Sequence, residues 1–283
     1  MQRGFYGMEC FIDRHSWIPF PALRAAGDDT TVGAGWFPPH GTASLSPPLP
    51  KRCNVVGRFM TFSIIARCER SGQFGVAAVT ALPAVGKLVT HAHPGAGAVA
   101  TQARLNPYLG IDGVALLREG LSADEVRRRL VEADPRIEAR QFSVIDAQGR
   151  TAPFTGIECL DWAGSREGPG YSIQGNRLAG EHVIDAIAGA FDEDSSLALA
   201  ERLINALEAG AKAGGDTKGA RSSTIYIVAN EEYPLWDIRV DEHEKPIEEL
   251  RRLHGIFGRE LLPEICRMPS RANPGGSNKE DFV

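Results

Sequence analysis

The segment TFSIIARCERSGQFGVAAVT, residues 61–80, constrains the fold of this chain more than any other. Two largely apolar runs, 61–68 and 73–80, flank the short polar stretch ERSG. Gly72, at the end of that stretch, can adopt the positive φ that a tight turn requires. The segment therefore predicts an antiparallel β-hairpin, and with it a sheet-containing domain that begins near Thr61.

Residues 1–60 have no comparable period. They are rich in Pro and Gly, with FPPHG and LSPPLP among them, and they lack the basic region and apolar run of a secretory signal. Three interpretations remain open: a disordered leader, a removed pro-segment, or a start codon assigned too early. In the last case Met60 is the initiator, and Thr61 becomes the first residue once that methionine is excised.

The rest of the chain alternates between β-type and helical patterns. We expect strands at 86–93, 96–102, 140–156 (a hairpin), 170–176, 221–230 and 235–240, and helices at 110–120, 122–134, 180–193, 195–210 and 245–258. Ser122 and Glu125 have capping-box spacing. Runs of strands followed by runs of helices predict one layered α+β domain with mostly antiparallel sheets over 61–260, followed by a C-terminal tail at 261–283.

Composition narrows the functional classes. The net charge is −5, and no block rich in Lys and Arg occurs, so we expect no nucleic-acid partner. No stretch approaches the roughly 18–20 apolar residues of a membrane span, so we expect no membrane association. The five cysteines are scattered without a C-x-x-C pair, which is typical of a reducing compartment and favours a cytoplasmic protein.

Thr61 is of chemical interest because a threonine at the first position of a chain differs from one inside it. A hydroxyl is a weak nucleophile unless a base takes its proton. A free α-amino group, with a pKa of about 7.7–8.0, is suited to that task at neutral pH. An N-terminal Thr61 would carry nucleophile and base in one residue. The position alone does not establish this role, since threonine is common in strands.

A series of motifs, in order along the chain, resembles the DUF1028 family, a set of uncharacterised proteins placed in the N-terminal nucleophile (Ntn) hydrolase superfamily. The resembling segments include MTFSIIAR at 60–67, GVAAVTALPAVG at 75–86, GAGAVATQARLNPYLG at 95–110, GPGYSIQGNRLAG at 168–180, GGDTKGARSS at 214–223 and RVDEHEKPIEELRRL at 239–253. The resemblance implies a four-layer αββα sandwich. It also implies hydrolysis of a small amide or short peptide through an acyl-enzyme on Thr61, with no metal or other cofactor.

The same motifs suggest groups that would assist the nucleophile. The Gly175 backbone N–H and the Asn176 side chain are donors of the kind that stabilise an oxyanion. Asp216, in a glycine-rich stretch, would hold the Thr61 amine or a substrate ammonium. Asn176 and Asp216 also have a structural interpretation, because both residue types satisfy turn backbone.

Four further residues of these motifs are candidates for substrate binding: Arg67, Thr101, Gln102 and Asn106. Thr101 and Gln102 would otherwise simply continue a strand ladder. Arg67 would otherwise form a surface ion pair.

Two rival functions remain open. His91 and His93 form an H-x-H pair of the kind that binds zinc, although zinc would require at least one more protein ligand. Alternatively, the domain is a non-catalytic sandwich that binds a small molecule or assembles with itself as a homo-oligomer. Such a protein would lose nothing on Thr61→Ala, whereas a hydrolase would be silenced.

Overall fold

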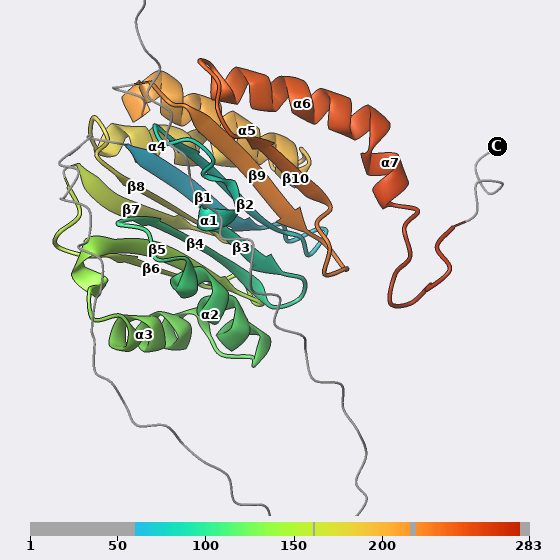
Figure 1. Ribbon diagram of the computed structural model, residues 1–283, viewed down its shortest axis with the longest axis horizontal. Helices are drawn as coiled ribbons and strands as arrows, with labels where there is room; N and C mark the ends of the chain where they lie inside the picture. Colours follow the sequence, from blue (N-terminus) through green and yellow to red (C-terminus); the bar gives the residue numbers. More distant parts are fainter. Residues whose placement is uncertain (1–59, 161, 216–218, 278–283) are drawn as a thin grey trace, which may run out of the picture. The chain divides into compact units, whose positions relative to one another are not determined.

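The computed structural model describes residues 60–160, 162–215 and 219–277. Within these ranges the strands form two sheets, and every pair of neighbouring strands is antiparallel, as the sequence predicts (Figure 1). The larger sheet contains, in spatial order, β10 (Trp236–Val240), β9 (Ser222–Val228), β2 (Phe74–Thr80), β1 (Thr61–Arg67), β8 (Tyr171–Asn176) and β7 (Ala163–Gly168). The smaller sheet contains β3 (Thr90–His93), β4 (Gly97–Ala103), β5 (Arg140–Asp146) and β6 (Thr151–Thr155).

The two sheets pack face to face, and helices cover their outer faces (Figure 1). Helices α4 (Glu181–Asp192), α5 (Leu199–Gly210) and α6 (Pro246–Glu260) pack on the six-stranded sheet, and α2 (Pro107–Arg118) and α3 (Ala123–Ala133) on the four-stranded sheet. Short turns of helix complete the described chain: α1 (Gly86–Val89), η1 (Ile137–Ala139), η2 (Ala211–Gly215) and α7 (Leu262–Ile265). No helix in the described ranges has the length and apolar character needed to cross a membrane.

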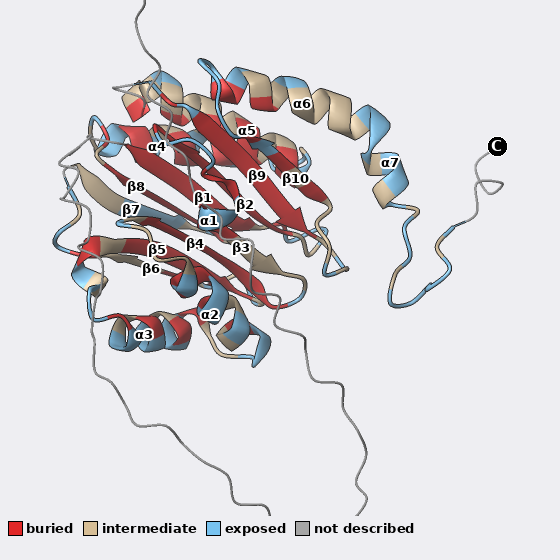
Figure 2. Ribbon diagram, viewed as in Figure 1, coloured by how far each residue is buried: buried red, intermediate tan, exposed pale blue. Residues whose placement is uncertain are grey.

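The side chains of β1 show how the layers form. Phe62 and Ile64 belong to the core beneath α4 and α5, whereas Ile65 belongs to a second core between the sheets. A strand that is buried on both faces reads as a nearly continuous apolar run, which is the pattern of residues 61–68. Figure 2 shows this burial along the strands, while the helices expose their outer faces. The same alternation directs Thr61 and Ser63 toward the four-stranded sheet.

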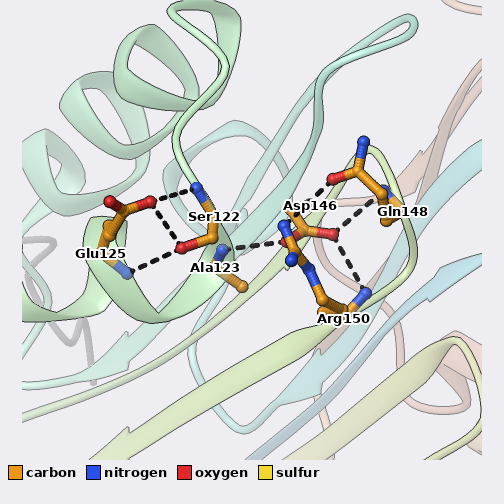
Figure 3. Close-up of polar contacts among 6 residues, drawn as sticks. All are labelled: Ser122, Ala123, Glu125, Asp146, Gln148 and Arg150. Atoms are coloured by element: carbon orange, nitrogen blue, oxygen red, sulfur yellow. Dashed lines mark hydrogen bonds and ion pairs between the residues drawn. The ribbon is translucent and has the colours of Figure 1, made fainter.

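Local sequence signals account for several element boundaries. Gly72 has φ of +69° in the hairpin turn between β1 and β2. Ser122 and Glu125 form the predicted capping box at the start of α3 (Figure 3). The buried Asp146 carboxylate accepts hydrogen bonds from the Ala123 and Gln148 backbone N–H groups, so it ties the turn after β5 to the start of α3 (Figure 3).

Apart from the short helical turns η1, η2 and α7, which are not expected, two elements differ from the sequence-based expectation. Gly86–Val89 is a single helical turn, α1, where a strand is expected, and β3 begins only at Thr90. The strand β7 is not predicted from the sequence at all. Its sequence, AGSREG, lies at the edge of the six-stranded sheet and is largely exposed, so it has none of the apolar alternation that marks a half-buried strand.

Gly110→Ala should destabilise the fold by about 1–3 kcal/mol, because overpacking a close contact has that cost. A Cβ at position 110, in α2, would lie 2.0 Å from the Cδ2 atom of His91 on β3. Urea unfolding measures the change. Gly189→Ala is the matched control: position 189 is an exposed site in α4 with nothing within 4 Å of the added atom, so this variant should gain about 0.5–1 kcal/mol. Equal stability of the two variants would contradict the packing described here.

Candidate functional site

Thr61 is the first residue of β1, a central strand of the six-stranded sheet. It pairs with Thr80 on β2 and with Asn176 on β8, so the three side chains lie side by side on one face of that sheet. This face points toward the four-stranded sheet. Thr61 is 8% exposed and Thr80 is 2% exposed. The candidate nucleophile therefore lies at the end of the inter-sheet space, where little of it reaches solvent.

The Thr61 hydroxyl forms a hydrogen bond with the Thr80 hydroxyl, with 2.9 Å between the two Oγ1 atoms. Thr80 Oγ1 also donates to the Met60 carbonyl oxygen at 2.8 Å. Because a hydroxyl has one proton, the Thr80 proton is committed to Met60. Thr61 must therefore be the donor in the pair of hydroxyls.

Gln141, on β5, connects the site to the opposite sheet. Its Oε1 accepts from Asn176 Nδ2 at 3.0 Å and from Gln102 Nε2 at 2.8 Å. Its Nε2 donates to the Gly175 carbonyl oxygen at 2.9 Å, with the Thr155 hydroxyl and the Gly164 carbonyl oxygen also within 3.1 Å. One buried amide thus holds Asn176, Gln102 and Gly175, all three of which the sequence motifs suggest as site residues.

Further polar side chains continue this arrangement between the sheets. Ser63 donates to Gln102 Oε1 at 2.7 Å, and Gln174 Nε2 donates to the Ala100 carbonyl oxygen at 3.0 Å. We call the whole set the inter-sheet polar layer; its members are Thr61, Ser63, Gln102, Gln141, Ser143, Ser172, Gln174 and Asn176. All of them are buried, so their hydrogen bonds hold the side chains in defined orientations without competition from water.

Thr101 and Asn106 lie elsewhere. Thr101 precedes Gln102 on β4 and points to the opposite face of that strand, where its hydroxyl donates to the Asn106 carbonyl oxygen at 3.3 Å. Asn106 is the N-cap of α2, and its Nδ2 donates to Asp134 Oδ2 at 2.8 Å. Thr101 therefore faces the helical layer that covers the four-stranded sheet, Asn106 lies at the start of a helix in that layer, and neither residue is brought to Thr61.

Arg67 lies at the opposite end of β1 from Thr61. The two positions are six residue steps apart along the strand, a distance of roughly 20 Å. Arg67 lines a separate cavity with Phe74, Pro94 and Asn230, among others. Asp216 lies outside the described residues.

Asp134, at the C-terminal end of α3, binds the Asn106 side chain. Burial alone would raise the pKa of the Asp134 carboxyl, but hydrogen bonds from Asn106, the Arg136 backbone N–H and Arg140 outweigh it. The pKa of Asp134 therefore lies below its usual value. The geometry of this cluster is that of a structural clamp between α2, α3 and β5.

His91 and His93 do not form a metal centre with other side chains. In the described ranges, no group of three or more His, Cys, Asp or Glu residues is placed to hold a metal ion. His91 packs against Gly110 of α2, and burial lowers the pKa of its imidazole. The Nδ1 atom of His93 lies 2.8 Å from the Pro94 carbonyl oxygen.

Sequence reasoning missed Thr80 and Gln141, the two residues that contact Thr61 and Asn176 most directly. A signal for Gln141 was present, since Gln141 and Ser143 alternate with apolar residues on the buried strand β5, whereas Thr80 ends an otherwise apolar strand. Such alternation shows which side chains share one face of a strand, but not which elements pack against that face. Only the packing of the two sheets brings Gln141 to Asn176.

Comparison with known proteins places this geometry in a family. Residues 61–250 match the model of DUF1028, described as a family of unknown function. The chain belongs to the DUF1028 family. A similar solved structure is the crystal structure of protein SPO2555 from Silicibacter pomeroyi, which carries the same family label, with 28% sequence identity and a TM-score of 0.71 over 77% of this chain and 95% of that one. A search of curated proteins gave no significant match.

The DUF1028 match begins at Thr61, the first residue of β1, and contains every member of the inter-sheet polar layer. The similarity to SPO2555 takes in nearly all of that chain but about three quarters of this one. The DUF1028 domain thus includes the candidate site in full.

Gln141→Leu should destabilise the DUF1028 domain by about 3 kcal/mol or more. The change leaves the buried Asn176 and Gln102 amides and the Gly175 carbonyl without their partner, at about 1–3 kcal/mol for each group left unpaired. Urea unfolding measures the loss. Gln148→Leu, in the exposed turn after β5, is the control and should change stability by less than about 0.5 kcal/mol. A loss below about 1 kcal/mol for Gln141→Leu would refute the role of this amide in joining the sheets.

Asp134→Asn should reduce the loss of folding stability that occurs as the pH is lowered. A carboxyl with a lowered pKa in the folded state stabilises the fold above its unfolded pKa of about 3.9, and this contribution disappears as pH falls through the folded value. The variant should therefore be less stable than wild type at neutral pH, with the difference shrinking toward pH 2, as followed by chemical unfolding at each pH. Glu132→Gln, an exposed position of α3, is the control at neutral pH, where it should cost less than about 0.5 kcal/mol. A constant difference at all pH values would contradict the assignment.

Proposed function

We propose that this DUF1028 protein is an amide-bond hydrolase of the N-terminal nucleophile type, active in a chain that starts at Thr61. The observation that carries the proposal is the position of the Thr61 hydroxyl. It lies at the start of a central strand, bonded to Thr80 and beside Asn176, at the residue where the family match begins. The stacking of helices, sheet, sheet and helices supports an αββα sandwich of the Ntn type.

The proposed reaction uses groups of this chain alone. The Thr61 α-amine takes the hydroxyl proton while Oγ1 attacks the carbonyl carbon of the substrate amide. Asn176 donates one amide proton to Gln141 and retains a second for the oxyanion. The protonated amine then gives its proton to the leaving nitrogen, the C–N bond breaks, and an ester on Thr61 remains. Water, activated by the same amine, hydrolyses that ester.

The proposed reaction gives the predicted site residues different roles. Gln102 and Gly175 support the site through Gln141, and Asp216 stays a proposed partner of the amine. Thr101, Asn106 and Arg67 have no part in the proposed chemistry, because the structure places them elsewhere. The buried position of Thr61 suits a small amide or a short peptide. The described cysteines are unpaired, which supports a cytoplasmic location.

One observation favours the alternative, a non-catalytic protein that binds a small molecule or assembles with itself. Met60 is 1% exposed, and its carbonyl oxygen accepts from Thr80 Oγ1 and from the Ala81 backbone N–H. The fold therefore accommodates a peptide bond before Thr61, and a chain that keeps this bond has no free amine at the site.

The deciding experiment is covalent labelling with a β-lactone, whose ring opens when a nucleophilic hydroxyl attacks its carbonyl carbon. The chain is expressed from Met60, and its mass first confirms that the methionine has been removed. Intact mass should then rise by one lactone on wild type. Thr61→Ser should keep the labelling, and Thr61→Ala should lower its rate by at least about 10³-fold.

The full-length chain is the second control and should remain unlabelled, because it has no amine at Thr61. Intact mass and N-terminal sequence of the protein from its native host show which form the cell contains. A native chain that retains residues 1–60, or a Thr61→Ala variant that is labelled as fast as wild type, would exclude the proposed reaction.

A further inference from the structure

Thr80 uses its whole hydrogen-bonding capacity in a chain that contains Met60. Its hydroxyl donates to the Met60 carbonyl oxygen at 2.8 Å and accepts from Thr61 Oγ1 at 2.9 Å. The Leu82 backbone N–H approaches the same oxygen at 3.4 Å. A hydroxyl has one donor and two acceptor sites, so all three sites are occupied.

The direction of these bonds has a chemical consequence. As long as the Met60 carbonyl is present, Thr61 must donate its proton to Thr80. A nucleophile with its proton directed to a neighbour that cannot act as a base is not activated. The hydroxyl pair thus holds Thr61 in an unreactive arrangement in the longer chain.

Loss of Met60 removes the acceptor of the Thr80 proton. Thr80 is 2% exposed in the chain that contains Met60, and its hydroxyl needs another acceptor once the Met60 carbonyl is gone. The atom already within hydrogen-bond distance is Thr61 Oγ1. If Thr80 donates to that oxygen, the Thr61 proton is free to turn to the new α-amine.

We propose that Thr80 is a positioning residue for Thr61 whose hydrogen bond reverses when the Met60 carbonyl is absent. In the chain that starts at Thr61, Thr80 Oγ1 donates to Thr61 Oγ1, stabilises the negative charge that develops there, and directs the Thr61 proton to the amine. The same donation stabilises Oγ1 as the leaving atom when the ester is hydrolysed. This inference rests on the proposed function and adds a specific device to it.

The test measures the rate of β-lactone labelling in chains that start at Thr61. Thr80→Val keeps the shape of the side chain and removes the donor. Its labelling should be slower by roughly ten- to a hundredfold, as expected for a lost hydrogen bond to a charged group. Thr80→Ser restores the hydroxyl and should label within about threefold of wild type. Thr90→Val is the matched control, because Thr90 is a buried strand threonine whose hydroxyl donates to Gly86 and lies outside the polar layer.

Urea unfolding of each variant separates a loss of reactivity from a loss of fold, and Thr80→Ala replaces Thr80→Val if the latter does not fold. Slow labelling of a folded Thr80 variant, with rescue by serine and no effect at Thr90, supports the proposal. Labelling of Thr80→Val at the wild-type rate overturns it while leaving Thr61 as the nucleophile. Failure of wild type itself to label overturns both this inference and the proposed function.

Discussion

The hydrogen bonds of one buried amide, that of Gln141, organise this structure. Two sheets that packed only through apolar side chains could slide over one another with little loss. Here Gln141 reaches from β5 to Asn176, Gly175 and Gln102, so the sheets meet in one arrangement at the end that contains Thr61. The apolar half of the interface, which includes Ile65, supplies burial, and the polar half supplies specificity.

The strand register then sets which side chains surround Thr61. Side chains alternate between faces with a period of two, so a slip of one residue would turn Thr61 into the helical core and bring Phe62 between the sheets. The pairing of β1 with β2 and β8 places Thr80 on one side of Thr61 and Asn176 on the other. The candidate site is therefore a property of three neighbouring strands and not of any loop.

The parts of this arrangement that follow from the sequence are the local ones. The β1–β2 hairpin and the capped start of α3 could be predicted because their signals lie within a few residues of each other. Alternation also predicts that Thr101 and Gln102 face opposite ways. It does not predict which of them faces Thr61, since that depends on how one sheet lies on the other. Gln141 escaped notice for the same reason, and β7 because an exposed edge strand needs no apolar pattern. Thr80 lies opposite Thr61 within the predicted hairpin, so its position depends on the register of that hairpin and not on the second sheet.

The burial of Met60 has a consequence for the order of events in the cell. A peptidase needs an accessible chain, and Met60 in the folded domain is 1% exposed, since its side chain belongs to the core beneath α4 and α5. Any enzyme that exposes the Thr61 amine must therefore act on the nascent chain before it folds, that is, before β1 enters the sheet between β2 and β8. Under the proposed function, maturation and folding would then compete in time, and a chain that folds first would keep the Met60 peptide bond and lack the free amine.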